Sequence, residues 1–341
     1  MTPLTPPLTP ADLYRHSLTR LLGEGHQRPL DALPRLLEPG GDPGLPGRRG
    51  VLPGRAGGHA MSADRAVLVT GATGNTGSRV LSQLAPHGRP VRAAARHATA
   101  EAPESGRAVR FDWYDPATHE DALHGVDRAY LVPPVGDPDP GAVMLPFLER
   151  ARAAGVRRVV LLSSSAIPAG GPGVGRVHAV LPGMFEEWAV LRPSWFMQNF
   201  TGRHPHADSI RRDGVIMTAT GAGRIGFIDA DDIAAVAVRA LTDDTAPNTD
   251  LLLTGPEALS YADVAAVLGE VTGRTVTHRP ITPDRMRERM TALMPEEFAA
   301  LLAGLDASIA GGAEDRTTDT VERVTGRPPR GFRAFAEQHM G

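Results

Sequence analysis

The sequence predicts an α/β protein with a doubly wound parallel sheet and a smaller C-terminal lobe. Short apolar runs alternate with helical stretches after Met61, a pattern typical of parallel βαβ units. A glycine-rich turn directly follows the first apolar run. From about Asn199 the predicted elements become shorter and mixed, so we expect residues 199–341 to contribute a lobe that closes over the strand ends.

Residues 1–60 differ in composition from the rest of the chain. Pro, Gly and Arg are dense there, above all in residues 38–60, and such a segment cannot hold a helix or a strand for long. We expect a disordered extension over 1–60 and a single domain over 61–341. The alternative that the natural chain begins at Met61 stays open.

The apolar runs predict six strands, at 66–69, 90–95, 108–112, 129–132, 158–163 and 188–192. Helices are predicted at 76–86, 141–154, 231–241 and 261–271. The last two begin at "DADD" and "LSYAD", where Asp and Ser side chains can cap the first helical turn.

Composition limits the partners and the chemistry. The net charge of -3 supplies no basic field, so we expect a small-molecule substrate rather than nucleic acid. No apolar run approaches the roughly 20 residues that span a bilayer, and we expect no membrane partner. The chain has no cysteine, which suits a cytoplasmic location and excludes thiol chemistry. The oligomeric state is not predicted by these features.

All 36 basic residues are arginine, because the chain contains no lysine. A Schiff base, a P-loop lysine and a Tyr-Lys catalytic pair are therefore excluded.

The glycines of "VLVTGATGNTGSRV" (67–80) have the spacing GxxGxxG at Gly71, Gly74 and Gly77. Glycines permit a tight turn and let backbone N–H groups approach a pyrophosphate at the helix N-terminus. Such a motif is weak alone, but its place between the first strand and a helix predicts a dinucleotide site of the Rossmann type.

Two residues at the ends of the second and third predicted strands indicate which dinucleotide is bound. The second strand ends in "VRAAARHA", which offers Arg96 rather than an acidic residue for the ribose 2′-hydroxyl. A guanidinium there favours the 2′-phosphate of NADPH, unless Arg96 is only a solvated surface residue. Asp112 can accept a hydrogen bond from the adenine amine, or it can be a turn or capping residue.

The stretches "TGATGNTGSRV", "FDWYDP", "LRPSWFMQNF" and "LLTGPEALSYADVA" together resemble the NmrA-like atypical short-chain dehydrogenase/reductase family. They are most similar to the clade of clavine dehydrogenases, NADPH-dependent enzymes of secondary metabolism that reduce a cyclic iminium. The resemblance covers residues from about 66 to 335. It implies that the cofactor is bound by Gly71, Thr73, Gly74, Asn75, Thr76, Gly77, Arg96 and Asp112, with Pro133, Pro134 and Ser163 along the nicotinamide. It also implies a substrate side formed by Trp195, Phe196, Met197 and Asn199, for which Trp113 is a further apolar wall. The alternative is that the run "SWFMQNF" is simply core.

The stretch "VVLLSSSAIPAGGPGVGRVHAVL" (159–181) resembles the catalytic strand of a reductase but lacks the tyrosine and lysine that normally follow. Ketone reduction therefore loses its usual proton donor. An iminium carbon becomes a neutral amine on accepting hydride, and a quinone gives a stabilised anion, so neither needs an enzyme acid in that step. We predict an NADPH-dependent reductase of an iminium or imine, a quinone or a conjugated alkene.

Two residues of this stretch are candidates for a catalytic role. His178 is the one titratable group that could donate a proton, and Ser163 could orient the substrate or the carboxamide. The alternatives are a structural histidine and a turn-forming serine. A different class of function is an NADP(H)-sensing protein that docks a partner without turnover. We expect no metal, because the close pair His204 and His206 has a spacing that is common in loops.

Overall fold

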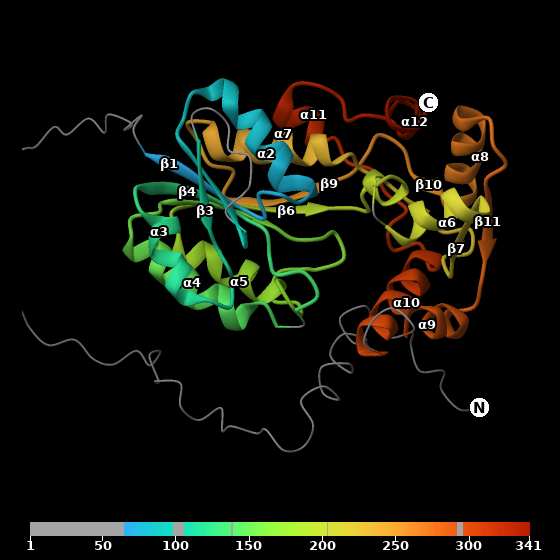
Figure 1. Cartoon of the computed structure of the whole chain (residues 1–341), viewed down its shortest axis with the longest axis horizontal. Helices are drawn as coiled ribbons and strands as arrows, with labels where there is room; N and C mark the ends of the chain where they lie inside the picture. Colours follow the sequence, from blue (N-terminus) through green and yellow to red (C-terminus); the bar gives the residue numbers. More distant parts are fainter. Residues whose placement is uncertain (1–64, 98–105, 138, 203, 292–295) are drawn as a thin grey trace, which may run out of the picture.

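The computed structural model of the chain describes residues 65–97, 106–137, 139–202, 204–291 and 296–341 (Figure 1). The extension expected over residues 1–60 lies outside the described residues. Seven parallel strands form the main sheet in the order β3-β2-β1-β4-β5-β6-β9. They are β1 (Ala66–Thr70), β2 (Val91–Ala95), β3 (Gly106–Arg110), β4 (Val126–Leu131), β5 (Arg158–Leu162), β6 (Glu187–Pro193) and β9 (Thr249–Leu253). The order reverses between β1 and β4, which confirms the doubly wound sheet and places its ligand-binding switch point there.

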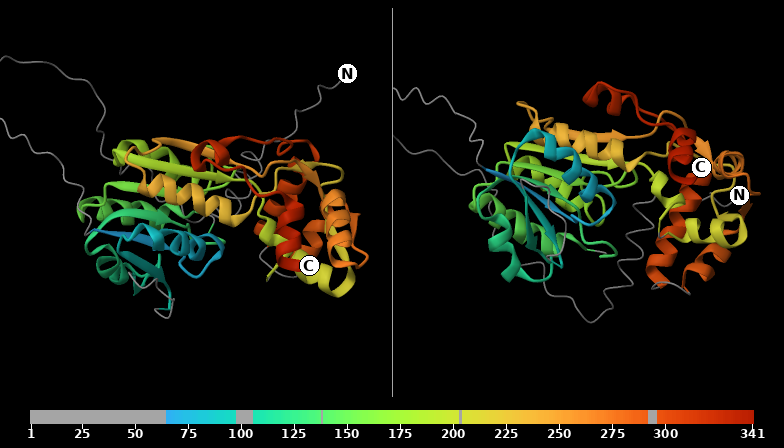
Figure 2. Two further views of the ribbon diagram at one scale, coloured as in Figure 1. Left: turned by 90° about the horizontal axis from the view of Figure 1, so that it is seen from above. Right: turned by 45° about the horizontal axis from the view of Figure 1, so that its top comes forward.

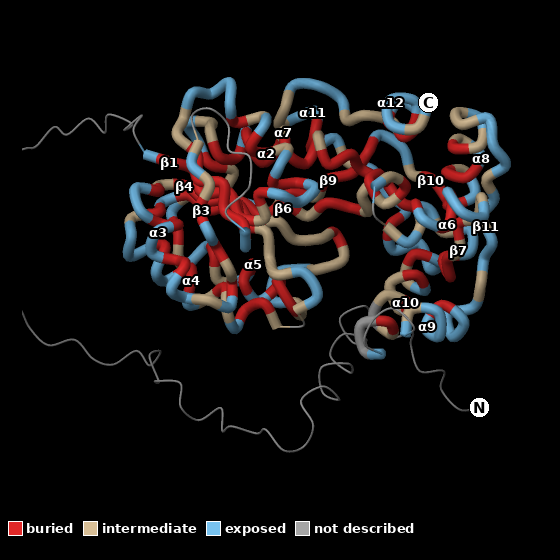
Figure 3. The backbone as a smooth tube through the Cα atoms, in the orientation of Figure 1, coloured by how far each residue is buried: buried red, intermediate tan, exposed pale blue. Residues whose placement is uncertain are grey.

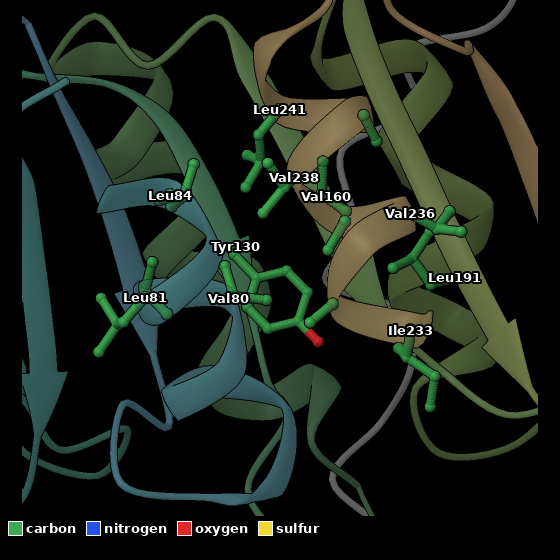
Figure 4. Packing of buried hydrophobic residues seen from close by; sticks show 14 of the residues in the cluster. Val80, Leu81, Leu84, Tyr130, Val160, Leu191, Ile233, Val236, Val238 and Leu241 are labelled. Atoms are coloured by element: carbon green, nitrogen blue, oxygen red, sulfur yellow. The ribbon is translucent and has the colours of Figure 1, made fainter. Parts of the chain in front are cut away.

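Helices cover both faces of the main sheet (Figures 1 and 2). One face carries α2 (Asn75–Leu84), α7 (Ala230–Thr242) and α11 (Thr320–Thr325); the other carries α3 (His119–Leu123), α4 (Gly141–Ala153) and α5 (Gly175–Met184). The 3₁₀ turns η2 (Ala85–His87) and η3 (Pro116–Thr118) lie in the connections. Side chains of α2 and α7 pack on either side of Tyr130 (Figure 4). Burial on both faces explains why central strands such as β1 and β5 are mostly apolar, whereas the edge strand β3 is not.

The remaining elements form a smaller lobe at one end of the main sheet (Figure 1). Its helical elements are η4 (Met197–Phe200), α6 (Pro205–Asp213), α8 (Tyr261–Thr272), α9 (Pro283–Thr291), α10 (Glu296–Ala310) and α12 (Phe332–Met340). Two small sheets complete it, β7 (Val215–Thr218) with β11 (Thr277–Pro280), and β8 (Arg224–Ile225) with β10 (Leu259–Ser260). Phe200, Phe227, Phe332 and Phe335 lie in its own apolar core.

The lobe is not one continuous stretch of residues 199–341, because α7, β9 and α11 return to the main sheet. The chain therefore crosses between the two parts several times. Figure 3 shows buried residues in both parts, along the strands of the sheet and on the inner sides of the lobe helices.

Most predicted elements agree closely with the structure. The fourth strand, expected at 129–132, spans Val126–Leu131, and β9 is a seventh strand that the sequence did not predict. The third strand is expected at 108–112 but spans Gly106–Arg110, because the chain turns at Asp112, whose carboxylate accepts the Tyr114 N–H at 3.0 Å. Both predicted caps are present: the Asp229 side chain accepts the Asp231 N–H, and Ser260 forms a capping box with Asp263.

Candidate functional site

The glycine turn brings the backbone of Gly71 against the first turn of α2. A Cβ on Gly77 would lie 2.1 Å from the Gly71 carbonyl oxygen, so a side chain at residue 77 would displace the backbone. Gly71 has φ +61°, a left-handed conformation that glycine adopts without strain. The N-cap of α2 is Gly74, and among the described residues no side chain caps the helix N-terminus. The first N–H groups of α2 are therefore available to a phosphate.

A cavity of about 530 Å³ lies beside this turn, at the carboxyl ends of the main strands. Its volume is typical of sites for small molecules and cofactors. Among the predicted site residues it is lined by Gly71, Thr73, Gly74, Asn75, Thr76, Arg96, Asp112, Trp113, Pro133, Pro134 and Phe196. The predicted residues Gly77, Ser163, His178, Trp195, Met197 and Asn199 do not line it. The predicted residues that line the cavity follow five strands, namely β1, β2, β3, β4 and β6. A cavity in this position fits a dinucleotide.

The strand order divides this cavity into two halves. We call the residues that follow β1, β2 and β3 the cofactor half, and those at the ends of β4, β5 and β6 the acceptor half. Every ionisable lining residue, namely Arg96, Asp112 and Tyr114, belongs to the cofactor half. The lining of the acceptor half consists of Val132, Pro133, Pro134, Val135, Leu162 and Phe196, which are all apolar.

Arg96 directly follows β2 and is exposed at the cavity edge. Within the described part of the chain its guanidinium makes no hydrogen bond or ion pair. Arg92, on the same strand, is instead buried and donates to the Asp121 carbonyl at 2.9 Å. Arg96 is thus the guanidinium at this site that can bind an added anion.

Asp112 has the turn role considered from the sequence, and it is also placed at the cavity. Its Oδ1 accepts the Tyr114 N–H in a turn, and the residue also lines the cavity. Trp113 donates from Nε1 to the Val132 carbonyl at 3.0 Å and packs edge-on against Phe111, with ring centroids 4.9 Å apart. Trp113 is therefore a wall of the cofactor half.

Tyr114 is a cavity residue that the sequence analysis did not select. It is 62% exposed, and its hydroxyl donates to Asp137 at 2.6 Å, which joins the loop after β3 to the loop after β4. Burial of the hydroxyl and the neighbouring Asp137 raise the pKa of Tyr114 to about 12. The other lining residues missed were Ala94, Ala95, Phe111, Val132, Val135 and Leu162. Their shared signal is position at a strand end, which could have identified them.

Ser163 continues β5, since its N–H donates to the Leu191 carbonyl at 2.7 Å. Its hydroxyl is buried and has no hydrogen-bond partner among the described residues. Ser165, two residues on, instead donates its hydroxyl to Glu314 of the lobe at 2.9 Å. Of these two hydroxyls, only that of Ser163 lacks a hydrogen-bond partner among the described residues.

His178 lies on α5, beneath the sheet, and is 4% exposed. Its ring centroid is 6.4 Å from that of Trp188, near the start of β6. Burial lowers the pKa of His178, against the smaller opposing effect of Asp250. The imidazole is consequently mostly unprotonated at neutral pH.

The segment 195–199 is mostly enclosed by the lobe. Met197 has no exposed surface and packs in the lobe core. For this residue the structure agrees with the alternative that the run "SWFMQNF" is core. Trp195 is half-buried against the same core, whereas Phe196 lines the cavity. The structure thus brings Phe196, but not its neighbours, to the cavity surface.

His204 and His206 have a local structural role. The Nδ1 atom of His204 accepts the His206 N–H at 3.2 Å and caps α6. Burial lowers the pKa of His206 to about 3. Within the described residues no group of His, Asp and Glu is placed to hold a metal ion. None of the helices described there has the length and apolarity needed to cross a membrane.

Comparison with known proteins identifies the family. Residues 71–244 match the NAD(P)H-binding family. The chain is 46% identical over 280 residues to the uncharacterized oxidoreductase YesF of Bacillus subtilis (strain 168), which covers 82% of this chain and 96% of that protein. It is 37% identical over 283 residues to festuclavine synthase II of Penicillium roqueforti (strain FM164), which covers 80% of this chain and 97% of that protein.

A solved structure shares the fold. The NADPH-dependent quinone oxidoreductase QOR2 of Escherichia coli, complexed with NADPH, matches with a TM-score of 0.68 at 22% identity, covering 80% of this chain and 98% of that one. The expected fold, family and cofactor class are confirmed by these matches. The chain belongs to the NAD(P)H-binding family, in its NmrA-like branch with the clavine dehydrogenases, and is an NAD(P)H-dependent oxidoreductase.

Proposed function

We propose that the protein uses NADPH to reduce an acceptor that is already activated before it binds, namely an iminium or imine, a quinone or a conjugated alkene. The observation that carries this proposal is the apolar lining of the acceptor half, which has no ionisable residue. An acceptor that must be protonated as it receives hydride finds no donor there. An iminium or a quinone does not need one.

The other candidate proton donors support the same conclusion. Tyr114 lies in the cofactor half, and its proton is held by Asp137. Tyr130 and Tyr261 are fully buried, and burial raises the pKa of both hydroxyls. The chain has no lysine that could lower a tyrosine pKa. The lowered pKa of His178 leaves its imidazole neutral near pH 7.

The residues of the cofactor half fit NADPH. The free N–H groups of α2 would hold the pyrophosphate, Arg96 the 2′-phosphate and Asp112 the adenine amine. Pro133 and Pro134 would bound the nicotinamide. When bound, NADPH supplies the hydride. Phe196 and Leu162 would exclude water and hold the acceptor close to it.

Among the relatives, one is named a festuclavine synthase and the solved structure is a quinone oxidoreductase. The second name specifies a quinone, which is an acceptor of the proposed class. Trp195 and Asn199, expected on the substrate side, do not line this cavity, and the proposal does not depend on them. A cytoplasmic location fits the absence of cysteine and the use of NADPH.

The test is NADPH oxidation by the full-length protein with a cyclic iminium, a quinone and a ketone of matched size. Each rate is corrected for the reaction without enzyme. We expect kcat/KM for the iminium or the quinone to exceed that for the ketone by at least about 10²-fold, the low end of what a general acid contributes. Rapid ketone reduction would overturn the proposal.

A further inference from the structure

The segment that carries Phe196 is fixed by buried side-chain hydrogen bonds to the start of α7. Gln198 donates from Nε2 to Oδ1 of Asp229 at 2.7 Å, and its Oε1 accepts the Ala230 N–H at 3.0 Å. Gln198 is 8% exposed and Asp229 is fully buried. Because these groups are shielded from water, each bond that is lost leaves a polar atom unsatisfied. The side chain of Gln198 therefore fixes the segment in one position.

Backbone bonds join the same two segments. The Met197 N–H donates to the Ile228 carbonyl at 2.9 Å, and the Ile228 N–H donates to the Trp195 carbonyl at 2.9 Å. Phe196 and Ile228 form an isolated parallel bridge. Displacement of the start of α7 would therefore displace Phe196 and change the width of the acceptor half.

Arg330 compensates the buried charge of Asp229. Its Nη1 lies 2.6 Å from Oδ2 of Asp229 and 3.6 Å from a carboxylate oxygen of Asp231. Asp231 in turn pairs with Arg79 of α2, the helix that begins at the glycine turn, at 2.9 Å. A buried carboxylate without its partner is strongly destabilised, so Arg330 is required for this arrangement.

Residues 326–331, which we call the C-terminal arm, carry Arg330 between the two parts of the molecule. The arm runs from α11 on the main sheet to α12 in the lobe (Figure 1). Phe332 and Phe335, directly after it, are fully buried in the lobe core. The arm also carries Arg327, whose Nη1 donates to Asp232 at 2.8 Å. Arg327 has no contact with Gln198 or Asp229 among the described residues.

We propose that Gln198, Asp229 and Arg330 are positioning residues that set the location of Phe196 and thereby which acceptors the cavity admits. The assignment of Phe196 as an acceptor wall rests on the proposed function. Acceptor selection would then depend on the far C-terminus of the chain, through a relay that touches neither cofactor nor acceptor.

The first test compares two quinones of different size, 1,4-benzoquinone and menadione, as acceptors. In Gln198→Leu and Arg330→Ala the ratio of their kcat/KM values should change by about tenfold or more, whereas the Kd for NADPH should stay within about twofold. Arg330→Lys keeps the charge and should retain most of the original ratio. Arg333→Ala is the control, because this exposed arginine of α12 pairs with the exposed Glu270 and contacts neither Gln198 nor the start of α7 among the described residues, so the ratio should stay unchanged. The proposal would be overturned if the ratio in Gln198→Leu and in Arg330→Ala equalled that of the parent protein.

The second test does not depend on turnover. In a Trp113→Phe, Trp188→Phe background, Trp195 is the only tryptophan and reports on the segment next to Phe196. Quenching by acrylamide should increase about twofold or more in Gln198→Leu and Arg330→Ala, but not in Arg333→Ala. Gln198→Leu keeps the Asp229–Arg330 pair, so it remains informative if Arg330→Ala fails to fold. Increased quenching in Gln198→Leu, together with a parent protein that reduces no quinone, imine, iminium or conjugated alkene, would support the positioning role while rejecting the proposed function. Unchanged quenching in Gln198→Leu would reject the positioning role.

Discussion

The cofactor half and the acceptor half of the cavity are held in place in different ways. In the cofactor half, Gly71 and Arg96 directly follow β1 and β2, Asp112 lies two residues after β3, and the backbone fixes their positions. In the acceptor half, Phe196 depends on Gln198, Asp229 and Arg330, which are separated by up to 132 residues of the chain (330 minus 198). The first half is a local structure, whereas the second depends on long-range contacts. The cofactor half should therefore tolerate changes in the lobe, but not changes in its own turn.

The largest expected effect tests how strictly the glycine turn is fixed. In Gly77→Ala the added Cβ would lie 2.1 Å from the Gly71 carbonyl oxygen, and this contact is with backbone. The turn must move, and we expect the affinity for NADPH to fall by about 100-fold or more, or about 3 kcal/mol. Titration of NADPH fluorescence measures this change.

Gly74→Ala and Gly183→Ala are the controls for that substitution. A Cβ on Gly74 would lie 3.2 Å from the same oxygen, so its effect should be smaller. Gly183 lies in α5 and a Cβ there meets no atom within 4 Å, so the affinity should not change. Equal affinities in all three variants would show that the turn is not rigid and would remove the contrast between the halves.

The second effect concerns the lobe that supports the acceptor half. Burial raises the pKa of Asp306 on α10 to about 6, although its carboxylate accepts the Ala219 N–H at 2.7 Å. The folded state therefore holds this proton more tightly than the unfolded state does. The protonated carboxyl group therefore contributes about 2–3 kcal/mol to the free energy of unfolding below about pH 4. This contribution is lost as the pH rises through about 6.

Asp306→Asn removes that dependence while keeping an acceptor for the Ala219 N–H. The melting temperature of the variant should rise relative to the parent protein between pH 4 and pH 7, as measured by circular dichroism. The Kd for NADPH of the two proteins should remain equal across this range if the halves are independent. A constant difference in melting temperature would show that Asp306 ionises normally in the fold.

The contrast between the halves also explains what the sequence could predict. The glycine turn, the strand ends and the caps at Asp229 and Ser260 depend on residues close in the chain, and each was predicted. The return of α7, β9 and α11 to the main sheet was not, because it depends on tertiary packing rather than on local periodicity. Gln198 was overlooked within the run "SWFMQNF" because its partner Asp229 was identified only as a helix cap. Likewise, Met197 and Phe196 are adjacent apolar residues, and only the packing of the lobe decides which one faces the cavity.

A smaller effect tests the charge of the cofactor half. Arg96→Ala should reduce the preference for NADPH over NADH by about 1–3 kcal/mol, the range for losing one charge-assisted contact. Arg92 cannot replace it, since it is buried against Asp121. Arg107→Ala is the control, because Arg107 is an exposed arginine on β3 that does not line the cavity. Fluorescence titration with NADPH and NADH measures this preference. An unchanged preference in Arg96→Ala would mean that another group binds the 2′-phosphate.

The smallest expected effect belongs to the acceptor half. His178→Gln should lower kcat with a cyclic iminium by less than about tenfold, or about 1.4 kcal/mol, because hydride transfer to an iminium leaves no charge that a proton must neutralise. Glutamine approximates the volume of the imidazole, so the core beneath β6 should remain filled. Burial lowers the pKa of His178, and protonation of this residue should leave no inflection in the pH profile of kcat above pH 7. A loss of more than a hundredfold, together with a pH profile that disappears in the variant, would identify His178 as a general acid. The acceptor would then have a proton donor in the protein. His178 would replace the missing tyrosine as the acid, and the protein would reduce ketones.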